Sequence, residues 1–179
     1  MFAYTLDNEI RLLLLHDSMA ERLCDLVNEN RAYLSHWLPW VPNSQSPSHY
    51  QAYIKHTLTQ YANGEAMVCA MEYQGDIVGV CGFNRIDRQL GVTELGYWIG
   101  EAYQGNGVVT RACEFLTTYT FTELGLYKVQ LSAAVDNKPS RRVAKRLGME
   151  LEGVIRRQEK VGEQVLDHAV YGILKEDQR

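Results

Sequence analysis

The sequence predicts one α/β domain built on a mixed sheet, antiparallel in its first strands and partly parallel afterwards. Three strand-like runs follow one another with connections of hairpin length, which is typical of an antiparallel meander. A glycine-rich loop, a helical stretch and a further strand-like run come next, and a crossover helix places its two strands parallel. With 179 residues and a mass of 20.5 kDa, the chain can bury one core. We therefore expect residues 1–179 to form a single domain.

The composition is that of a globular protein without a membrane or nucleic-acid partner. A net charge of −4 argues against binding nucleic acid through a basic face. No apolar run approaches the ~20 residues of a membrane span. Residues 1–9 carry acidic side chains and lack the apolar core of a signal peptide. These observations predict a cytoplasmic protein.

The cysteines and histidines do not predict a metal site. Four cysteines lie far apart in apolar runs and form no CxxC pair: Cys24, Cys69, Cys81 and Cys113. They are most simply buried free thiols in a reducing compartment, with metal ligation as the alternative. The five histidines show no ligand spacing. We expect no metal.

The first third of the chain predicts one strand and two helices. Residues 9–15 form a strand-like run, although its leucines would also suit a helix. Ser18-x-x-Glu21 fits a capping box, and apolar residues continue at helical spacing as far as Arg31. A proline-rich loop follows over residues 39–47. The next helix has an apolar face from Tyr50 to Tyr61 and ends near Asn63-Gly64.

The remaining elements follow from alternating apolar runs and from glycines that end them. The predicted strands cover residues 66–73, 77–86, 92–99, 128–135, 149–157 and 165–174. The predicted helices run from Val109 to Leu124, ended by Gly125, and from Ser140 to Leu147, ended by Gly148. Gly162 joins the last two strands.

The loop Gln104-Gly105-Asn106-Gly107 stands between a strand and a helix. Small residues leave backbone N–H groups uncovered, and a helix N-terminus adds roughly half a positive charge, so this design suits a phosphate. A glycine-rich turn without a ligand is the alternative. No Gly-Lys-Ser or Gly-Lys-Thr follows, which excludes a P-loop, and Thr110 stands where a dinucleotide fingerprint has Gly or Ala. The loop therefore predicts a phosphorylated cofactor bound in the middle of a mixed sheet.

Several motifs in this order resemble the GNAT superfamily of N-acetyltransferases, in particular its RimJ/RimL-like branch, over nearly the whole chain. They are Gly96-Tyr97-Trp98-Ile99, Gln104-Gly105-x-Gly107, Asp136-Asn137-x-x-Ser140, Arg146-Leu147-Gly148-Met149, Trp37-Leu38-Pro39-Trp40, and Glu159 ahead of Asp167. The resemblance implies a three-layer fold with antiparallel N-terminal strands and a parallel pair that splays at the cofactor site. It also implies transfer of an acetyl group from acetyl-CoA, with no metal, to a primary amine.

The same resemblance implies how the cofactor binds. The CoA pyrophosphate would lie on the amides of Gln104, Gly105, Asn106, Gly107, Val108, Val109 and Thr110. The pantetheine arm would pair with backbone at a bulge over Tyr97-Trp98-Ile99, where an N–H also stabilises the oxyanion. The side chains of Tyr97 and Trp98 would be core and pocket walls. Asn137 would turn the chain and bond the cofactor arm, and Arg141 or Arg142 would contact a CoA phosphate unless they are a solvated helix face.

Two residues match catalytic positions of RimL-like relatives. Ser140 would protonate the departing thiolate; an N-cap is its alternative role, and the two are compatible. Glu159 would be a general base acting through water. Its alternative is a solvated charge beside Arg156, Arg157 and Lys160.

The resemblance leaves the acceptor amine open. Tyr33, Trp37, Trp40 and the loop over residues 39–47 would form the acceptor groove, while the tryptophans could instead fill core. A protein α-amine with a pKa of about 7.7–8.0 needs less base catalysis than a lysine at about 10.4. An N-terminal α-amine, as on ribosomal proteins, is therefore the expected acceptor. A small amine such as an antibiotic or metabolite, or a non-catalytic CoA-binding module, is the alternative, and family analogy suggests a homodimer.

Overall fold

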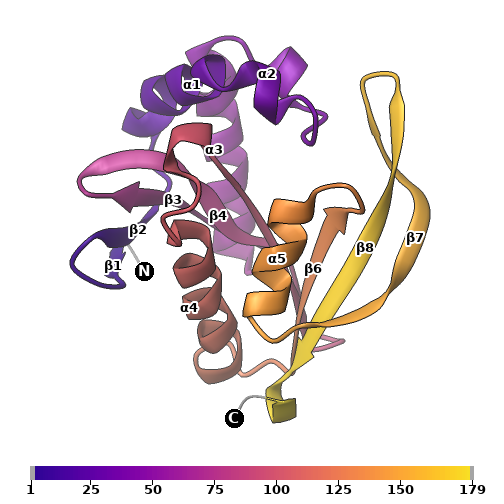
Figure 1. Cartoon of the computed structure of the whole chain (residues 1–179). Coiled ribbons are helices and arrows are strands. Elements are labelled where there is room, and N and C mark those ends of the chain that lie inside the picture. Colours follow the sequence, from indigo (N-terminus) through magenta and orange to yellow (C-terminus); the bar gives the residue numbers. More distant parts are fainter. Residues whose placement is uncertain (1–2, 178–179) are drawn as a thin grey trace.

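The computed structural model describes residues 3–177 and contains one eight-stranded sheet with helices on both faces (Figure 1). The strands are β1 (Ala3–Thr5), β2 (Ile10–Leu14), β3 (Met67–Tyr73), β4 (Asp76–Asp87), β5 (Val92–Ile99), β6 (Lys128–Ala134), β7 (Glu150–Val161) and β8 (Gln164–Leu174). The helices are α1 (Ala20–Glu29), α2 (Arg31–Leu34), α3 (Pro47–Asn63), α4 (Val108–Thr122) and α5 (Lys138–Arg146). Short 3-10 turns cover Asp17–Met19, Val41–Asn43, Glu101–Tyr103 and Lys175–Asp177.

The strand order β1-β2-β3-β4-β5-β6-β8-β7 confirms the predicted mixed sheet. The strands β3, β4 and β5 form the expected antiparallel meander. The one parallel pair among the described strands is β5 with β6, joined by α4 as the crossover helix. The short strand β1 was not predicted, because three residues with exposed side chains carry no apolar pattern.

Alternating side chains of the strands build two cores, one on each face of the sheet. Met67, Cys69 and Met71 of β3 pack with α4 and α5. Val68 and Ala70, between them in sequence, pack with α1 and α3. This two-residue period makes three layers, with α4 and α5 in front of the sheet and α3 behind it in Figure 1.

The predicted start and end of the first helix are wrong. The chain turns through Asp17–Met19 before α1 begins, and this turn is capped by His16 Nδ1, which accepts from Ser18 N–H at 3.3 Å. Ser18 is therefore no capping-box residue, and Met19 precedes α1 without a side-chain cap. At the other end, Asn30 leaves the helical conformation. Its Nδ2 donates to Leu26 O and its Oδ1 accepts from Glu101 N–H, both at 2.8 Å.

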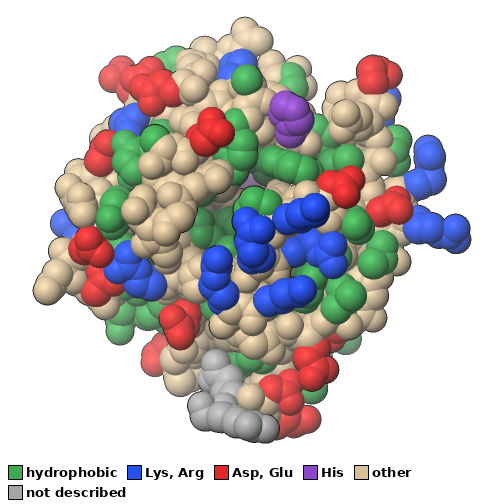
Figure 2. All heavy atoms as spheres, viewed as in Figure 1, with side chains coloured by type: hydrophobic (Ala, Val, Ile, Leu, Met, Phe, Trp, Pro, Cys, Tyr) green, Lys and Arg blue, Asp and Glu red, His purple; other side chains and the backbone are tan. Residues whose placement is uncertain are grey.

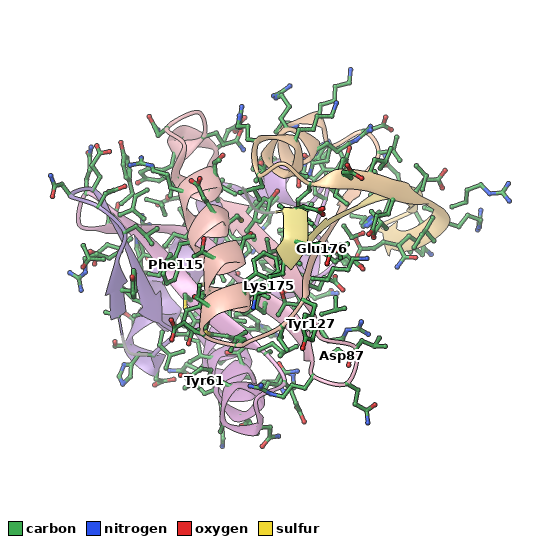
Figure 3. All side chains as sticks on the ribbon, turned by 90° about the horizontal axis from the view of Figure 1, so that it is seen from below. Tyr61, Asp87, Phe115, Tyr127, Lys175 and Glu176 are labelled. Atoms are coloured by element: carbon green, nitrogen blue, oxygen red, sulfur yellow. The ribbon has the colours of Figure 1, made fainter. Side chains whose placement is uncertain are left out.

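The parallel pair is closed at one end of the sheet and open at the other. Its register covers only four pairs, from Val92 with Lys128 to Leu95 with Leu131. At the closed end, Lys175 N–H donates to Tyr127 O and Tyr127 N–H donates to Gly91 O, both at 2.8 Å. Figure 3 shows Tyr127, Lys175 and Asp87 gathered at this end. Beyond Leu95, β5 keeps its pairing with β4 but has no pairing with β6 in the described chain.

The bulge expected in Tyr97-Trp98-Ile99 lies in the neighbouring strand. The register of β4 with β5 is regular from Gly79–Ile99 to Phe83–Leu95, and the extra residue is Asn84. A Cβ on Gly96 would lie 2.3 Å from the Asn84 amide, so any other residue here would displace that side chain. The resemblance predicted a distortion at this place in the sheet but assigned it to the wrong strand.

The last two strands form a long hairpin that extends beyond the helices (Figure 1). The strand β7 runs four residues further than predicted, to Val161, because a two-residue turn at Gly162 lets both strands continue. Its register slips between Ile155 and Glu159. Arg157 in this slip adopts φ 54°, which is uncommon for a residue other than glycine.

The four cysteines are buried and unbridged, as predicted. Burial raises the pKa of Cys69 to about 12 and raises the pKa of Cys81 and of Cys113 as well. These three thiols therefore stay protonated and act as small core side chains. In the described part of the chain, no helix is long and apolar enough to cross a membrane.

Candidate active site

Two cavities meet where β5 and β6 separate. The first, here called the loop cavity, has a volume of about 860 Å³ and follows the end of β5, the glycine loop and α5. The second, here called the sheet cavity, has a volume of about 430 Å³ and lies between β5, β6 and the β7–β8 hairpin. Both are lined by Trp37, Leu38, Tyr97, Trp98, Asn137 and Ser140. The two cavities therefore adjoin along these shared residues.

The loop cavity collects the residues predicted to bind the cofactor. All of them except Asn106 line it. Gly105 and Gly107 hold φ angles of 81° and 73°, and Gly107 precedes α4 without a side-chain cap. The first N–H groups of α4 are left for a ligand, since a helix has no internal partners for them. This arrangement fits a pyrophosphate.

Basic side chains of α5 border the loop cavity. Figure 2 shows a cluster of Lys and Arg over this helix. Of the two arginines proposed from the sequence, Arg142 lines the cavity together with Arg146. Arg141 is used elsewhere, because its Nε donates to Tyr171 Oη and its Nη1 to Val135 O, both at 2.9 Å. The positive charge that α5 offers to phosphates thus comes from Arg142 and Arg146.

A side chain absent from the sequence prediction braces the glycine loop. Arg111 of α4 donates to the Asn106 carbonyl at 3.0 Å and pairs with Asp7 at 2.7 Å and Glu9 at 3.2 Å. The pKa of Glu9 is lowered by its hydrogen bond from Gln74 and by Arg111. Only the fold brings these carboxylates, about a hundred residues earlier in the chain, to α4. Arg111 ties the turn before β2 to the loop that holds the phosphate.

The Ser140 hydroxyl lies where the two cavities join. It is 2.7 Å from the Tyr97 hydroxyl, and either group can donate. Burial raises the pKa of Tyr97, so its phenol stays protonated. The N-cap of α5 is Asn137, whose Oδ1 accepts from Ser140 N–H at 3.1 Å. The alternative role of Ser140 as the N-cap is therefore wrong, since the helix begins two residues earlier than predicted and the hydroxyl bonds to Tyr97 instead of capping the helix.

Glu159 lines the sheet cavity with its side chain 35% exposed. The slip in β7 places residues 156–158 between Ile155 and Glu159, where β8 has only Asp167 between their partners His168 and Leu166. Arg157 N–H donates to Asp167 Oδ1 at 2.8 Å and fixes this slip. Glu159 and His168 therefore share one face, with Glu159 Oε2 3.4 Å from His168 Nε2.

The aromatic residues predicted for the acceptor divide between the cavities. Trp37 lines both, Trp40 lines the sheet cavity, and Tyr33 lines the loop cavity. The Tyr33 hydroxyl accepts a hydrogen bond from Gln104 Nε2, which places Tyr33 beside the glycine loop. Neither tryptophan is a core residue, because Trp37 is half-buried and Trp40 is 36% exposed. Trp40 packs on Trp98 with the ring centres 6.1 Å apart.

Comparison with known proteins agrees with this geometry. The family model for the acetyltransferase (GNAT) domain matches residues 9–150. The chain belongs to the GNAT family. This GNAT chain is 34% identical over 178 residues to a putative ribosomal N-acetyltransferase, YdaF of Bacillus subtilis, covering 99% of this chain and 97% of that protein. It is 27% identical to the ribosomal-protein-serine acetyltransferase of Escherichia coli, covering 87% of each chain.

A solved acetyltransferase structure shows the same fold with acetyl-CoA bound. The microcin C7 self-immunity acetyltransferase MccE, in complex with acetyl-CoA and AMP, has a TM-score of 0.90 and 29% identity, with 94% of each chain covered. The protein is therefore an acetyl-CoA-dependent N-acetyltransferase. The family and these relatives confirm the predicted activity and cofactor. The loop cavity has the glycine loop and basic border that such a cofactor needs.

Proposed function

We propose that this N-acetyltransferase acts on the N-terminal α-amine of a protein, such as a ribosomal protein. The observation that carries the proposal is the meeting of the two cavities at Ser140, with the Glu159 carboxylate on the acceptor side. Two relatives named for ribosomal acetylation support it, one of them over almost the whole chain. As such proteins are made in the cytoplasm, we place the enzyme there.

The chemistry of the amine supports an α-amine over a lysine side chain. Only a neutral amine attacks a thioester, and an α-amine with a pKa of about 7.7–8.0 is partly neutral near pH 7. A lysine at about 10.4 has a pKa about 2.5 units higher, so deprotonating it would need about 3.5 kcal/mol more from the enzyme. In the part of the chain described, the one carboxylate paired with a histidine on the sheet cavity is Glu159. A single base of this kind suits the easier acceptor.

We assign the proton transfers to Glu159 and Ser140. When bound, acetyl-CoA supplies an acetyl group on a sulfur whose departure leaves a thiolate. Glu159 accepts the proton that the amine nitrogen loses as its bond to the acetyl carbon forms. Ser140 donates its proton to the departing sulfur, and the Tyr97 hydroxyl 2.7 Å away donates a hydrogen bond to the serine oxygen until it regains a proton from solvent. Glu159 returns the amine proton to solvent. Backbone N–H groups at the free end of β5 would stabilise the oxyanion.

We further propose that residues 1–179 work as one domain. All eight strands join one sheet, and the two cavities are lined by elements from α2 to β8 of the same chain. Each chain would therefore carry a complete site, whether or not the protein forms a homodimer.

A small amine is the second candidate acceptor. It is favoured by the likeness to MccE, whose complex holds AMP beside acetyl-CoA. A nucleotide-linked or antibiotic amine would occupy the same sheet cavity, with Trp37 and Trp40 as stacking surfaces.

Thiol release from acetyl-CoA with a panel of acceptors tests the proposal. The panel holds peptides that begin with Ser or Ala, an N-terminally blocked peptide with one Lys, spermidine, an aminoglycoside and an aminoacyl-AMP analogue. We expect the free peptides to give a kcat/KM at least tenfold above every other acceptor. Faster turnover of a small amine would replace the proposal with the second candidate. Tight CoA binding without turnover of any amine would indicate a non-catalytic module.

A further inference from the structure

One wall of the sheet cavity carries a buried nitrogen without a hydrogen-bond partner. His168 of β8 is only 9% exposed, and its Nε2 is the one buried side-chain nitrogen or oxygen of the described residues that lacks such a bond. Its Nδ1 lies 3.0 Å from Ser132 Oγ of β6. Its Nε2 faces Glu159 Oε2 at 3.4 Å. Three side chains from three strands thus form a row that ends at the carboxylate in the cavity.

The partners decide where the His168 proton lies. A carboxylate can only accept hydrogen bonds. Nε2 must therefore carry a proton, because its lone pair would otherwise face the negative charge of Glu159. In the neutral imidazole, Nδ1 is then an acceptor, and the Ser132 hydroxyl donates to it. Each group in the row donates toward Glu159. The Glu159 side chain is 35% exposed and can turn to shorten the remaining 3.4 Å.

The geometry points to His168 as a positioning residue that holds the Glu159 carboxylate against the acceptor amine. This inference rests on the proposed role of Glu159 as the base. The slip in β7 brings Glu159 to the edge of the cavity, but a glutamate has three side-chain torsions and needs a second anchor to keep one oxygen on the amine. The Nε2–H of His168 supplies that anchor by binding one carboxylate oxygen, which leaves the other oxygen for the proton. Ser132 fixes the orientation of the ring.

The protonation state of His168 gives the most direct test. Long-range ¹H–¹⁵N spectra of the protein labelled at histidine distinguish the two neutral forms of the ring. We expect the neutral ring of His168 to carry its proton on Nε2. A proton on Nδ1 would overturn the inference, since Nε2 could not then donate to Glu159. The signal is assigned by its absence in His168→Asn or, where that variant does not fold, by its shift in Ser132→Ala.

A pair of matched substitutions separates the two ends of the ring. The amide nitrogen of Gln falls near the position of Nε2, and that of Asn falls near Nδ1. With acetyl-CoA and whichever of the Ser- and Ala-initiated peptides the wild type acetylates faster, we expect His168→Gln to keep kcat within about threefold. We expect His168→Asn to lower kcat by about tenfold or more, with the KM for acetyl-CoA unchanged. Equal losses in both variants would show a merely structural role.

A double-mutant cycle shows whether His168 acts through Glu159. In the Glu159→Gln background, His168→Asn should lower kcat no further, because there is no carboxylate left to position. If the losses in kcat of the two single variants multiply in the double variant, the inference is overturned. Wild-type turnover by Glu159→Gln would instead refute the proposed base. If Glu159→Gln is impaired while His168→Asn is fully active, only the role of His168 is refuted. If the wild type acetylates neither peptide, the position of the proton in the ring spectrum decides whether the inference about His168 holds.

Discussion

The Ser140 hydroxyl stands between the two cavities with Tyr97 as its hydrogen-bond partner. We predict that Ser140→Ala lowers kcat more than tenfold, because the thiolate then leaves without a proton donor. The dissociation constant for CoA, measured by calorimetric titration, should change little, since the phosphates bind at the glycine loop and at Arg142 and Arg146.

The control for Ser140→Ala is Ser48→Ala, an exposed serine of α3 that lines neither cavity. It should leave kcat and CoA affinity unchanged. Wild-type turnover by Ser140→Ala would remove Ser140 from the chemistry. Because Asn137 already caps α5, a loss of stability in Ser140→Ala should be small, and a large one would point to a structural role instead.

At the scale of single residues, motifs predicted the site residues that lie within one stretch of sequence. They missed the residues that only the fold brings together. Ser140 and Glu159 were predicted because each matches a position in a family motif. Ser132 and His168 were missed, since they lie 36 residues apart and meet only through the register of β6 with β8. The only signal for His168 in the sequence was a single histidine in an apolar strand. Such a histidine can equally well be a core residue.

At the scale of elements, the glycine loop sets the start of α4. Gly107 precedes the helix with φ 73°, and Gly125 follows it with φ 66°. We predict that Gly107→Ala costs about 1–2 kcal/mol of stability, because a Cβ disfavours this backbone conformation. The same change should raise the dissociation constant of CoA about tenfold, because the amides of the loop move out of line with the phosphate. Thermal melting and calorimetric titration measure the two effects.

Gly125→Ala is a matched control at the other end of the same helix. A Cβ there meets no atom within 4 Å, so the substitution carries only the backbone strain. It should lower the melting temperature as Gly107→Ala does while leaving CoA affinity at the wild-type value. Equal losses of CoA affinity in both variants would show that helix stability, and not the loop, governs cofactor binding.

The elements were predicted best where an apolar period and a glycine agree. Helix α3 ends at Asn63 with Gly64 as its left-handed cap, as predicted. Irregular backbone has no comparable signal in the sequence. The Asn84 bulge stands inside an otherwise apolar run, and the slip around Arg157 depends on the Asp167 side chain of the neighbouring strand. Both irregularities shape the sheet cavity, which is why its detailed form could not be predicted from sequence.

At the scale of the whole molecule, the strands β5 and β6 are hydrogen-bonded at one end of the sheet and separate at the other. The parallel pair closes around Tyr127 and Gly91 and separates beyond Leu95 and Leu131. The two cavities occupy the open end, one on the side of α4 and α5 and one beside the β7–β8 hairpin. The mixed sheet and the parallel pair were predicted from the order of elements, since a crossover helix permits few other topologies. The three layers were implied by the family resemblance.

The central claim is that the amine entering the sheet cavity is a protein α-amine. One peptide with a free N-terminal serine and an internal lysine places both amines before the enzyme at equal concentration. After reaction with acetyl-CoA, fragment mass spectrometry locates the acetyl group. We predict that it lies on the α-amine in at least nine of ten molecules. Acetylation mainly of the lysine side chain would contradict the proposed function.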